Sequence, residues 1–487
     1  MATTSADGKL SMFEKISFGS GDVGCTIIWN VVGMFLTIYY TDDLKISAAA
    51  VAAIMLSVRI FDGFSDLVMG YILDRTNSKL GKARPWILWS APFMAIFLVL
   101  CFSIPSFWSE TLKVVAAFTT YFFLTVVIYT ACNLSYCALT SFLTEDLQER
   151  ASMNSIRFVM TATGSLILGY LTPVVAKALG GYITICIVYG IVALVLLLLC
   201  FFVCKERVAP QPRRPEDKVS AKESLRVLSK NTFFYYLVIF FIIDFANAGI
   251  TGSSGMYLAR YIIQDDAFFG HLNLASVLPQ MVGCFLFPWI MNMIKGKWNA
   301  VIAGYILYVV GYGMCAFLTS IEMKIGTSEF VIMLVGQGIK GFGWGLHLVA
   351  LFAMIADVAE YGEWKAGRRL EGATYSVSSF GFKIGLGMGG AVVGLVLSMV
   401  NYDAALEVQP QETLEAILTI NFTIPLVLSV IGLVLSLCNN LDKVYPQVMR
   451  DLAVRRAEEA RALGAIDPEH KAQAQANVDN ANNEAKA

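Results

Sequence analysis

The sequence predicts an all-α membrane protein with twelve transmembrane helices in two six-helix bundles. Of its 487 residues, 57% are hydrophobic and only 15% are charged, whereas a soluble domain is about 45–50% apolar and about 25% charged. Apolar stretches of roughly 20 residues, enough to cross a bilayer, recur along the chain. A hydrophilic segment, residues 205–230, divides these stretches six and six. Composition, stretch length and this division together define the predicted fold.

The predicted spans follow from hydropathy alone. Several are longer than 25 residues, which indicates tilted helices or helices that extend beyond the bilayer. We expect an N-terminal bundle over residues 1–204, a central loop over 205–230, a C-terminal bundle over 231–440 and a solvated, partly helical or disordered tail over 441–487. In chain order the spans cover residues 17–40, 46–73, 85–104, 114–143, 151–179, 182–204, 231–261, 272–294, 299–321, 329–358, 372–401 and 414–440.

The distribution of Lys and Arg predicts the orientation, because short cytoplasmic loops are enriched in both. The loop "DRTNSKLGKARP" after the second span is basic, and so are the loops after the sixth and tenth spans. The opposite loops, "TDDLK" and "NYDAALEVQPQE", are acidic or neutral. We therefore expect a multi-pass protein of the plasma (cell inner) membrane with both termini in the cytoplasm.

Several classes of function are disfavoured. With 36 basic and 37 acidic residues the net charge is −1, so no nucleic-acid partner is expected. The ten Cys lie mostly in apolar runs and the three His are scattered, so we expect no metal site and no cofactor. "GQGIKG" at 336–341 matches G-x-G-x-x-G, but membrane spans flank it, so it is interpreted as close helix packing. Without a nucleophile–base pair, an enzyme is not expected.

Two carboxylates interrupt the second span, in "RIFDGFSDLVMGYILDR" at 59–75. A charge at the centre of a bilayer costs about 2.5–3.5 kcal/mol on insertion scales, so such residues normally face a cavity or a partner. Asp62 and Asp66 are four residues apart and share one helix face. Arg59 lies three residues before Asp62, and Ser65 stands directly beside Asp66. This face could hold Na⁺ or a proton; the alternative is an ion-pair staple between helices.

Depth estimates place polar residues from both halves in one layer. At about 1.5 Å per residue, Asp62, Asp66, Thr130, Asn133 and Lys383 lie about 11–20 Å from the cytoplasmic ends of their spans. Asp22 and Arg157 lie nearer the cytoplasm, at about 8–9 Å. We expect the two acids and the lysine to meet around an aqueous cavity.

The motifs resemble those of a known transporter family. "RIFDGFSDLVMGYILDRTNSKLGKARPWIL" closely resembles the signature of the glycoside–pentoside–hexuronide:cation symporters. "IADVAEYGEWKAGRRLEGATYSV" is similar to their second signature, and "FGSGDVG" followed by "YYTD" matches their first span. The resemblance covers about residues 10–445. It implies the major facilitator fold and alternating access.

The resemblance implies a cation site. Asp62 and Asp66 match the family's cation-binding acids, and Thr130 matches a cation-site Thr. Ser65 stands where the melibiose carrier of the family has Asn, and Lys383 matches the lysine that links the sugar and cation sites.

The implied substrate site departs from that carrier. Thr26, Asn133 and Cys137 stand where the carrier has Asp, Asp and Trp, so melibiose is not the expected substrate. Arg157 matches an Arg near the sugar. Asp22, one turn before Thr26, either reaches the cavity or pairs with Arg157. The predicted substrate site comprises Asp22, Thr26, Asn133, Cys137, Arg157, Ser379 and Lys383.

Charged residues near the cytoplasmic ends of the spans form a predicted inner gate. They would pair in the outward-open state; the alternative is simple positive-inside anchoring. This set is Asp74, Arg75, Arg84, Arg150, Asp357, Glu360 and Arg369.

The expected function is a monomeric symporter that imports a glycoside, pentoside or hexuronide together with Na⁺ or H⁺. Its expected partners are this small-molecule sugar and the lipid bilayer. Three alternatives stay open: a transporter of a non-sugar or anionic organic solute, a lysolipid transporter, and a sensor that binds its ligand without transporting it.

Overall fold

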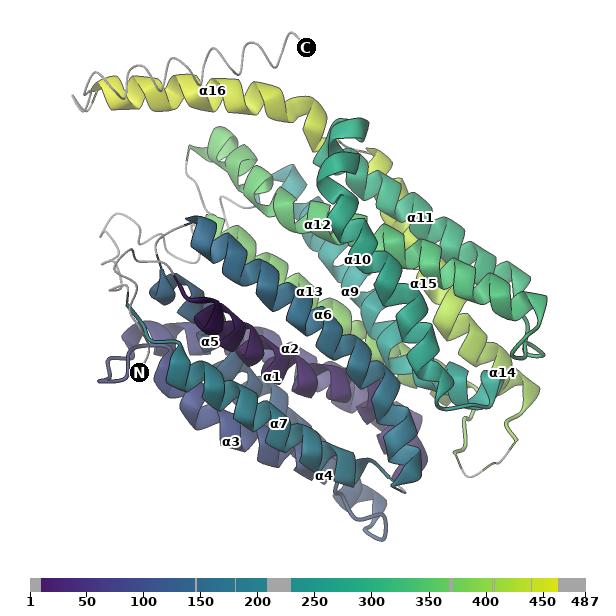
Figure 1. Ribbon diagram of the computed structural model, residues 1–487. Coiled ribbons are helices and arrows are strands. Elements are labelled where there is room, and N and C mark those ends of the chain that lie inside the picture. Colours follow the sequence, from purple (N-terminus) through teal and green to yellow (C-terminus); the bar gives the residue numbers. More distant parts are fainter. Residues whose placement is uncertain are drawn as a thin grey trace.

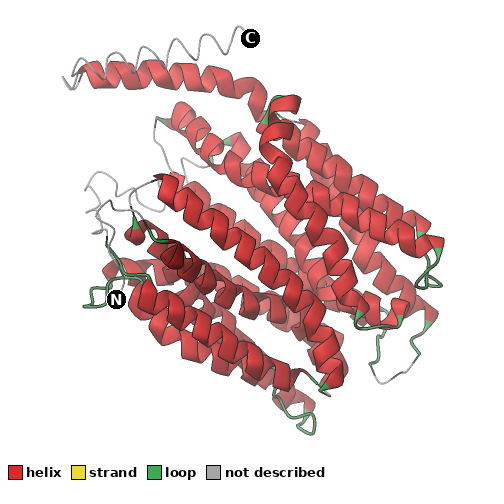
Figure 2. Ribbon diagram, in the orientation of Figure 1, coloured by secondary structure: helices red, strands yellow, loops and turns green. Residues whose placement is uncertain are grey.

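The computed structural model describes residues 10–144, 147–179, 181–207, 229–367, 371–404, 406, 408–438 and 440–462. Within these ranges every regular element is helical (Figure 2). Among the described residues, twelve helices are long and apolar enough to cross a membrane. The prediction of twelve spans is therefore confirmed.

Helices of the N-terminal half occupy one side of the molecule, and those of the C-terminal half the other (Figure 1). Several spans contain a short π-helical turn, labelled η. The N-terminal half consists of α1 Met12–Ile38, η1 Tyr39–Asp43, α2 Ala48–Arg75, α3 Arg84–Cys101, α4 Glu110–Phe122, η2 Phe123–Tyr129, α5 Thr130–Leu143, α6 Leu147–Ala178 and α7 Tyr182–Val203. The C-terminal half consists of α9 Thr232–Tyr257, η4 Leu258–Ile263, α10 Phe268–Ile294, α11 Lys297–Leu318, α12 Ser328–Ala366, α13 Glu371–Met399, α14 Gln411–Leu418, η5 Thr419–Thr423, α15 Ile424–Cys438 and α16 Leu441–Ala462.

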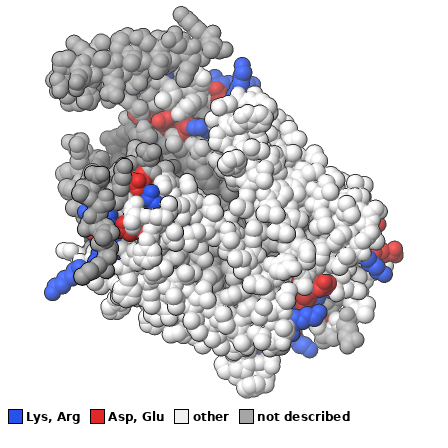
Figure 3. Space-filling model, viewed as in Figure 1, with Lys and Arg blue, Asp and Glu red and all other residues white. Residues whose placement is uncertain are grey.

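The outer surface suits a lipid environment. The face drawn in Figure 3 has a broad band without charged side chains, and the charged residues gather at its two ends. Large apolar side chains are exposed on the helices, among them Phe285 at 83% and Trp289 at 66%. An exposed apolar belt of this kind is stable against hydrocarbon and would not be stable in water.

Local sequence explains where several helices begin and end. Ser11 caps α1, because its hydroxyl accepts a hydrogen bond from the Glu14 N–H while the Glu14 carboxylate accepts one from the Ser11 N–H. Asn231 caps α9 by accepting from the Phe234 N–H at 3.1 Å. The 39-residue helix α12 ends at Gly367, whose φ of 74° is left-handed.

Glycines let helices approach closely where the halves meet. A Cβ on Gly394 of α13 would lie 2.8 Å from the Ala48 carbonyl oxygen of α2. A Cβ on Gly389 would lie 2.6 Å from the Ala246 carbonyl oxygen of α9. The glycine run of α13 therefore allows this helix to pack between α2 and α9. Gly336 of "GQGIKG" packs against Gly311 of α11 in the same way, which confirms its interpretation as helix packing.

The first part of the predicted tail is the helix α16, which lies across one end of the C-terminal half (Figure 1). Leu441, Val448 and Leu452 are buried against that half. The Trp364 indole donates to the Asp451 carboxylate at 2.9 Å. Residues 463–487 of the tail lie outside the described part of the chain.

Candidate functional site

A lysine of the C-terminal half lies between the two acids of the N-terminal half. Lys383 Nζ, on α13, donates to Asp62 Oδ1 at 2.9 Å and to Asp66 Oδ1 at 2.8 Å. Asp62 is fully buried, Lys383 is 8% exposed, and the Asp66 side chain is 25% exposed. The two acids and the lysine, which the depth estimate placed in one layer, are therefore in direct contact. Asp66 is the member of this trio most open to water.

Hydroxyl groups complete the oxygen cluster around Asp62. Thr130 Oγ1 donates to Asp62 Oδ1 at 3.0 Å, and it lies 3.1 Å from Ser65 Oγ. Arg59 Nη1 reaches Asp62 Oδ2 at 3.4 Å, and its guanidinium lies 4.3 Å from the centre of the Trp29 ring. Carboxylates and hydroxyls are the ligands that hard cations prefer. The described residues contain no group of three or more His, Cys, Asp or Glu that could hold a metal, so a cation here would rely on these hydroxyls.

A second ion pair lies among the predicted substrate residues. Arg157 Nε of α6 donates to Asp22 Oδ2 of α1 at 2.6 Å, so Asp22 pairs with Arg157. Thr26 and Asn133 are partly buried, and Cys137 is an exposed free thiol. The side chain of Ser379 lies outside the described residues.

A cavity of about 230 Å³ separates the two halves. Trp29, Asn30 and Arg59 line it from the N-terminal half, and Ser253 and Phe382 line it from the C-terminal half. Arg59 connects this space to Asp62, and Phe382 is the neighbour of Lys383 in the chain. The cavity thus adjoins the carboxylate–lysine cluster.

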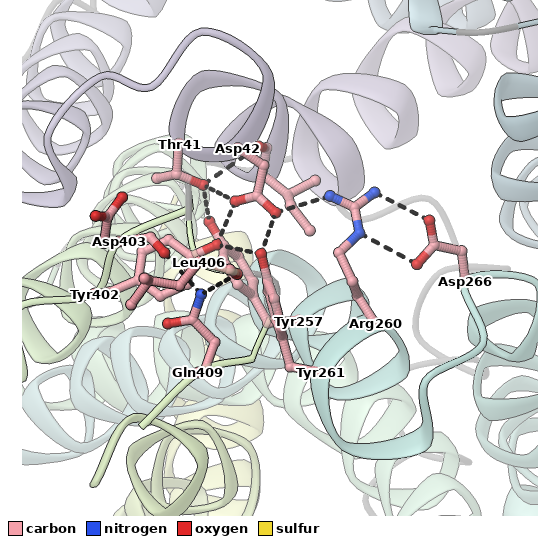
Figure 4. Close-up of polar contacts among 11 residues, drawn as sticks. Thr41, Asp42, Tyr257, Arg260, Tyr261, Asp266, Tyr402, Asp403, Leu406 and Gln409 are labelled. Carbon is pink, nitrogen blue, oxygen red and sulfur yellow. Dashed lines mark hydrogen bonds and ion pairs between the residues drawn. The ribbon is translucent and has the colours of Figure 1, made fainter. Parts of the chain in front are cut away.

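The end of the molecule at which α1 finishes holds a polar cluster that joins the two halves (Figure 4). Asp42 of η1 accepts hydrogen bonds from Arg260 Nη1 at 2.8 Å, from the Tyr261 hydroxyl at 2.8 Å and from the Tyr402 hydroxyl at 2.6 Å. Arg260 also pairs with Asp266 at 3.0 Å. We call Asp42, Arg260, Tyr261 and Tyr402 the latch.

Burial strengthens the latch. The Asp42 side chain is only 7% exposed. Burial, together with the charge of Asp42, raises the pKa of Tyr402 well above its usual value, so its hydroxyl stays protonated and can donate. Nearby, Thr41 Oγ1 and the Tyr257 hydroxyl lie 2.6 Å apart and form a further bridge between the halves.

The contacts described for the predicted gate residues at the opposite end join partners within one half. Arg84 donates to the Phe201 carbonyl oxygen at 2.8 Å, inside the N-terminal half. Asp357 pairs with Lys297 at 2.8 Å, inside the C-terminal half.

Two further gate residues also have close neighbours in their own halves. Glu360 accepts from the Tyr445 hydroxyl at 2.5 Å, and the Arg75 guanidinium lies 3.8 Å from the centre of the Tyr71 ring. The side chains of Asp74 and Arg150, and all of Arg369, lie outside the described residues.

A family profile described as "MFS/sugar transport protein" matches residues 17–443. The chain belongs to this family. Its members are transporters of the major facilitator superfamily, so this protein is a transporter and not an enzyme. The resemblance to the glycoside–pentoside–hexuronide:cation symporters is confirmed.

Individual relatives match almost end to end. The transporter is 33% identical to an uncharacterized symporter, YnaJ, of Bacillus subtilis, over 92% of this chain and 96% of the relative. It is 32% identical to the isoprimeverose transporter of Lactiplantibacillus pentosus, over 92% of each chain. The crystal structure of a mutant of the nucleoside transporter NupG superposes with a TM-score of 0.66 at 14% identity, over 87% of this chain and 99% of that one. The last similarity concerns the fold alone.

Sequence reasoning missed two groups in this transporter. The latch joins residues at or just beyond the ends of the first, seventh and eleventh spans, and "TDDLK" was noted only for its charge. Asp244 and His347 are both fully buried, with Oδ2 and Nε2 2.6 Å apart. No spacing along the chain relates Asp244 to His347, which is 103 residues away.

Proposed function

We propose that the protein imports a glycoside, pentoside or hexuronide into the cell by coupling its movement to an inward flow of Na⁺ or H⁺. Family membership supports the transport of a sugar, and a relative named an isoprimeverose transporter carries one. The observation that carries the coupling proposal is the contact of Lys383 with both Asp62 and Asp66. Through this contact, an ammonium group of the C-terminal half pairs with two carboxylates of the N-terminal half.

The coupling arises from competition for the same oxygen atoms. The Lys383 ammonium occupies Asp62 Oδ1 and Asp66 Oδ1, which an entering cation would also need. A bound Na⁺, or a proton on Asp66, weakens the hold of the acids on Lys383 and so loosens the contact between α2 and α13. Sugar binding then becomes dependent on the ion, and by linkage the ion binds more tightly when sugar is present.

The predicted orientation of the protein in the membrane implies which transport conformation the structure represents. If both termini are cytoplasmic, the latch lies on the outer side and holds it shut, so the state is inward-facing. Opening to the outside then requires the latch to separate. The predicted gate residues, among them Arg84 and Asp357, would meet across the halves in that second state.

The substrate would bind in the cavity between the halves. Trp29 offers an aromatic face on which a sugar ring can stack, and Asn30 offers an amide. The Asp22–Arg157 pair provides further polar groups in the same half, with Asp22 about two turns before Trp29 on α1. Because Asn133 and Cys137 replace groups of the melibiose carrier, a different glycoside is proposed.

The test is uptake by the purified protein in proteoliposomes. A panel of labelled glycosides, pentosides and hexuronides is offered with a Na⁺ gradient and a pH gradient imposed separately. Accumulation of at least one sugar, driven by one of the two gradients, is expected. Binding of a sugar with no flux under either gradient would contradict the proposal and would support the sensor.

A further inference from the structure

A second cavity of about 230 Å³ lies within the C-terminal half. Gln337, Lys340, Gly341 and Trp344 of α12 line it, and this spacing of three or four residues places them on one helix face. Residues of α9, α10 and α11 form most of the other walls, and Met34 of α1 closes one side. None of the described side chains of the predicted substrate site contributes to this cavity.

Lys340 is the unusual group in this wall. Arg59, Arg157 and Lys383 also lie within the spans, and each forms an ion pair with a carboxylate. Lys340 is 8% exposed, and no carboxylate of the described residues lies within 4.0 Å of its ammonium group. The Lys340 Nζ atom lies 4.9 Å from the centre of the Tyr312 ring. A buried cation of this kind is costly unless an anion completes it.

Other polar side chains that line the cavity have buried atoms without a hydrogen-bond partner among the described residues. Asn247 is 2% exposed, and its Oδ1 has no hydrogen-bond partner among the described residues, although its Nδ2 donates to Ser429. The hydroxyl of Tyr308 is likewise buried without a partner in this part of the chain. Both residues line the cavity. Buried polar atoms are normally satisfied, so these atoms favour a ligand that carries hydroxyl groups.

Packing fixes the position of Lys340. A Cβ on Gly311 of α11 would lie 2.8 Å from the Lys340 backbone nitrogen, so α11 and α12 are in close contact at this point. The rings of Trp344 and Tyr308 stack nearly parallel, with 6.0 Å between their centres. The cavity thus combines a fixed cation, unsatisfied polar atoms and aromatic walls.

We propose that this cavity binds the acidic portion of a sugar acid, with its carboxylate on Lys340 Nζ and its hydroxyl groups toward Asn247 and Tyr308. The inference rests on the proposed function and narrows it, because it favours a carboxylated sugar over a neutral one. It also assigns part of the substrate contact to α9, α11 and α12. A ligand that reaches Met34 would touch both halves.

The experiment compares matched sugars that differ only at C6. The pairs are glucuronic acid with glucose, galacturonic acid with galactose, and 4-nitrophenyl β-D-glucuronide with its glucoside. Binding to the purified protein in lipid nanodiscs is measured by calorimetry, and uptake is measured in proteoliposomes. We expect at least one acid to bind roughly 10- to 100-fold more tightly than its neutral partner, as for a buried charged hydrogen bond.

Substitutions of Lys340 test whether the preference for acidic sugars arises at this residue. Lys340→Gln should remove the preference for the acid by weakening its binding far more than that of the neutral sugar, and Lys340→Arg should keep the preference. Lys324→Gln removes an exposed charge of the same half and serves as the control. The preference of the unmodified protein is informative even if Lys340→Gln does not fold.

Each result decides the matter. The inference is overturned if no acid binds, if acid and neutral sugar bind equally, or if Lys340→Gln weakens both by the same factor. Binding and transport of neutral sugars in those cases would leave the proposed symport intact. Failure of every sugar, acidic or neutral, would overturn the symport proposal as well.

Discussion

Lys383 is the single residue on which the coupling proposal depends most. Among the described residues it is the one group of the C-terminal half in the cluster of Asp62, Asp66 and Thr130, and its ammonium lies within 2.9 Å of an oxygen of each acid. The sequence placed these residues at one depth because the 1.5 Å rise of a helix is regular. It could not show that they touch, since the crossing of α2 and α13 depends on glycines whose packing partners lie far away in the chain.

Replacing Lys383 by Ala should strengthen ion binding while it uncouples transport. Without the ammonium, the carboxylates of Asp62 and Asp66 repel each other, and a bound cation relieves this repulsion. We expect the apparent affinity for the coupling ion to rise roughly tenfold and ion-driven accumulation of sugar to disappear. Calorimetric ion titration and uptake measure the two effects, with Lys324→Ala as control. An unchanged ion affinity would contradict the competition between Lys383 and the ion.

Thr130 offers a finer test of the cation site. Its hydroxyl donates to Asp62 Oδ1 at 3.0 Å and lies beside Ser65. Thr130→Ala removes this oxygen and should weaken ion binding by about tenfold, in line with a hydrogen bond to a charged group. Thr130→Ser keeps the hydroxyl and should bind the ion as the unmodified protein does. Equal affinities for the two variants would exclude Thr130 from the site.

Among the helices, the turns η1 and η4 control how the halves meet. They bring Asp42 to Arg260 and Tyr261, and the loop after α13 adds Tyr402. The three segments are separated by more than 100 positions in the chain. Arg260, Tyr261 and Tyr402 stand in stretches of the sequence that contain no recognisable motif. No periodicity or spacing relates them, so the latch could be found only in three dimensions.

Asp42→Asn should shift the protein toward the state that is open at the latch end. It removes the charge that holds Arg260 and weakens the acceptor for two tyrosines. Spin labels at the exposed loop residues Ser106 and Lys324, with the exposed thiols Cys137 and Cys438 changed to Ser, report the separation of the halves. We expect the population with the longer distance to rise roughly tenfold.

The matched control for the latch is Glu110→Gln, an exposed acid at the same end. It should leave the distance distribution unchanged. A distribution for Asp42→Asn that equals that of the control would show that the latch does not hold the halves together.

The helix α16 stabilises the C-terminal half through its buried face. Leu452 is 1% exposed and packs with Val448 against that half. Leu452→Ala should lower the free energy of unfolding by about 2–5 kcal/mol, as is usual for a buried leucine. The exposed Val454→Ala should have little effect. Thermal unfolding in detergent compares the two variants, and equal transitions would mean that α16 is not part of the folded core.

For the whole molecule, hydropathy was sufficient to predict twelve spans, because each apolar stretch has to match the thickness of a bilayer. The signature around Asp62 and Asp66 identified the family. Two features needed the structure: the latch, and the cavity around Lys340. Only the folded chain shows that the described neighbours of Lys340 supply no carboxylate.

The central claim is that the carboxylates of the second span couple the ion to the sugar, and Asp66→Asn tests it most directly. Asp66 is the more exposed acid, so the variant removes an ion ligand at small structural cost. Proteoliposomes measure gradient-driven accumulation and sugar exchange at equal concentrations on both sides, with Glu412→Gln as the exposed control. The account predicts that accumulation falls at least tenfold, in the range expected from one lost charged contact, while exchange continues. Accumulation equal to that of the unmodified protein would contradict it.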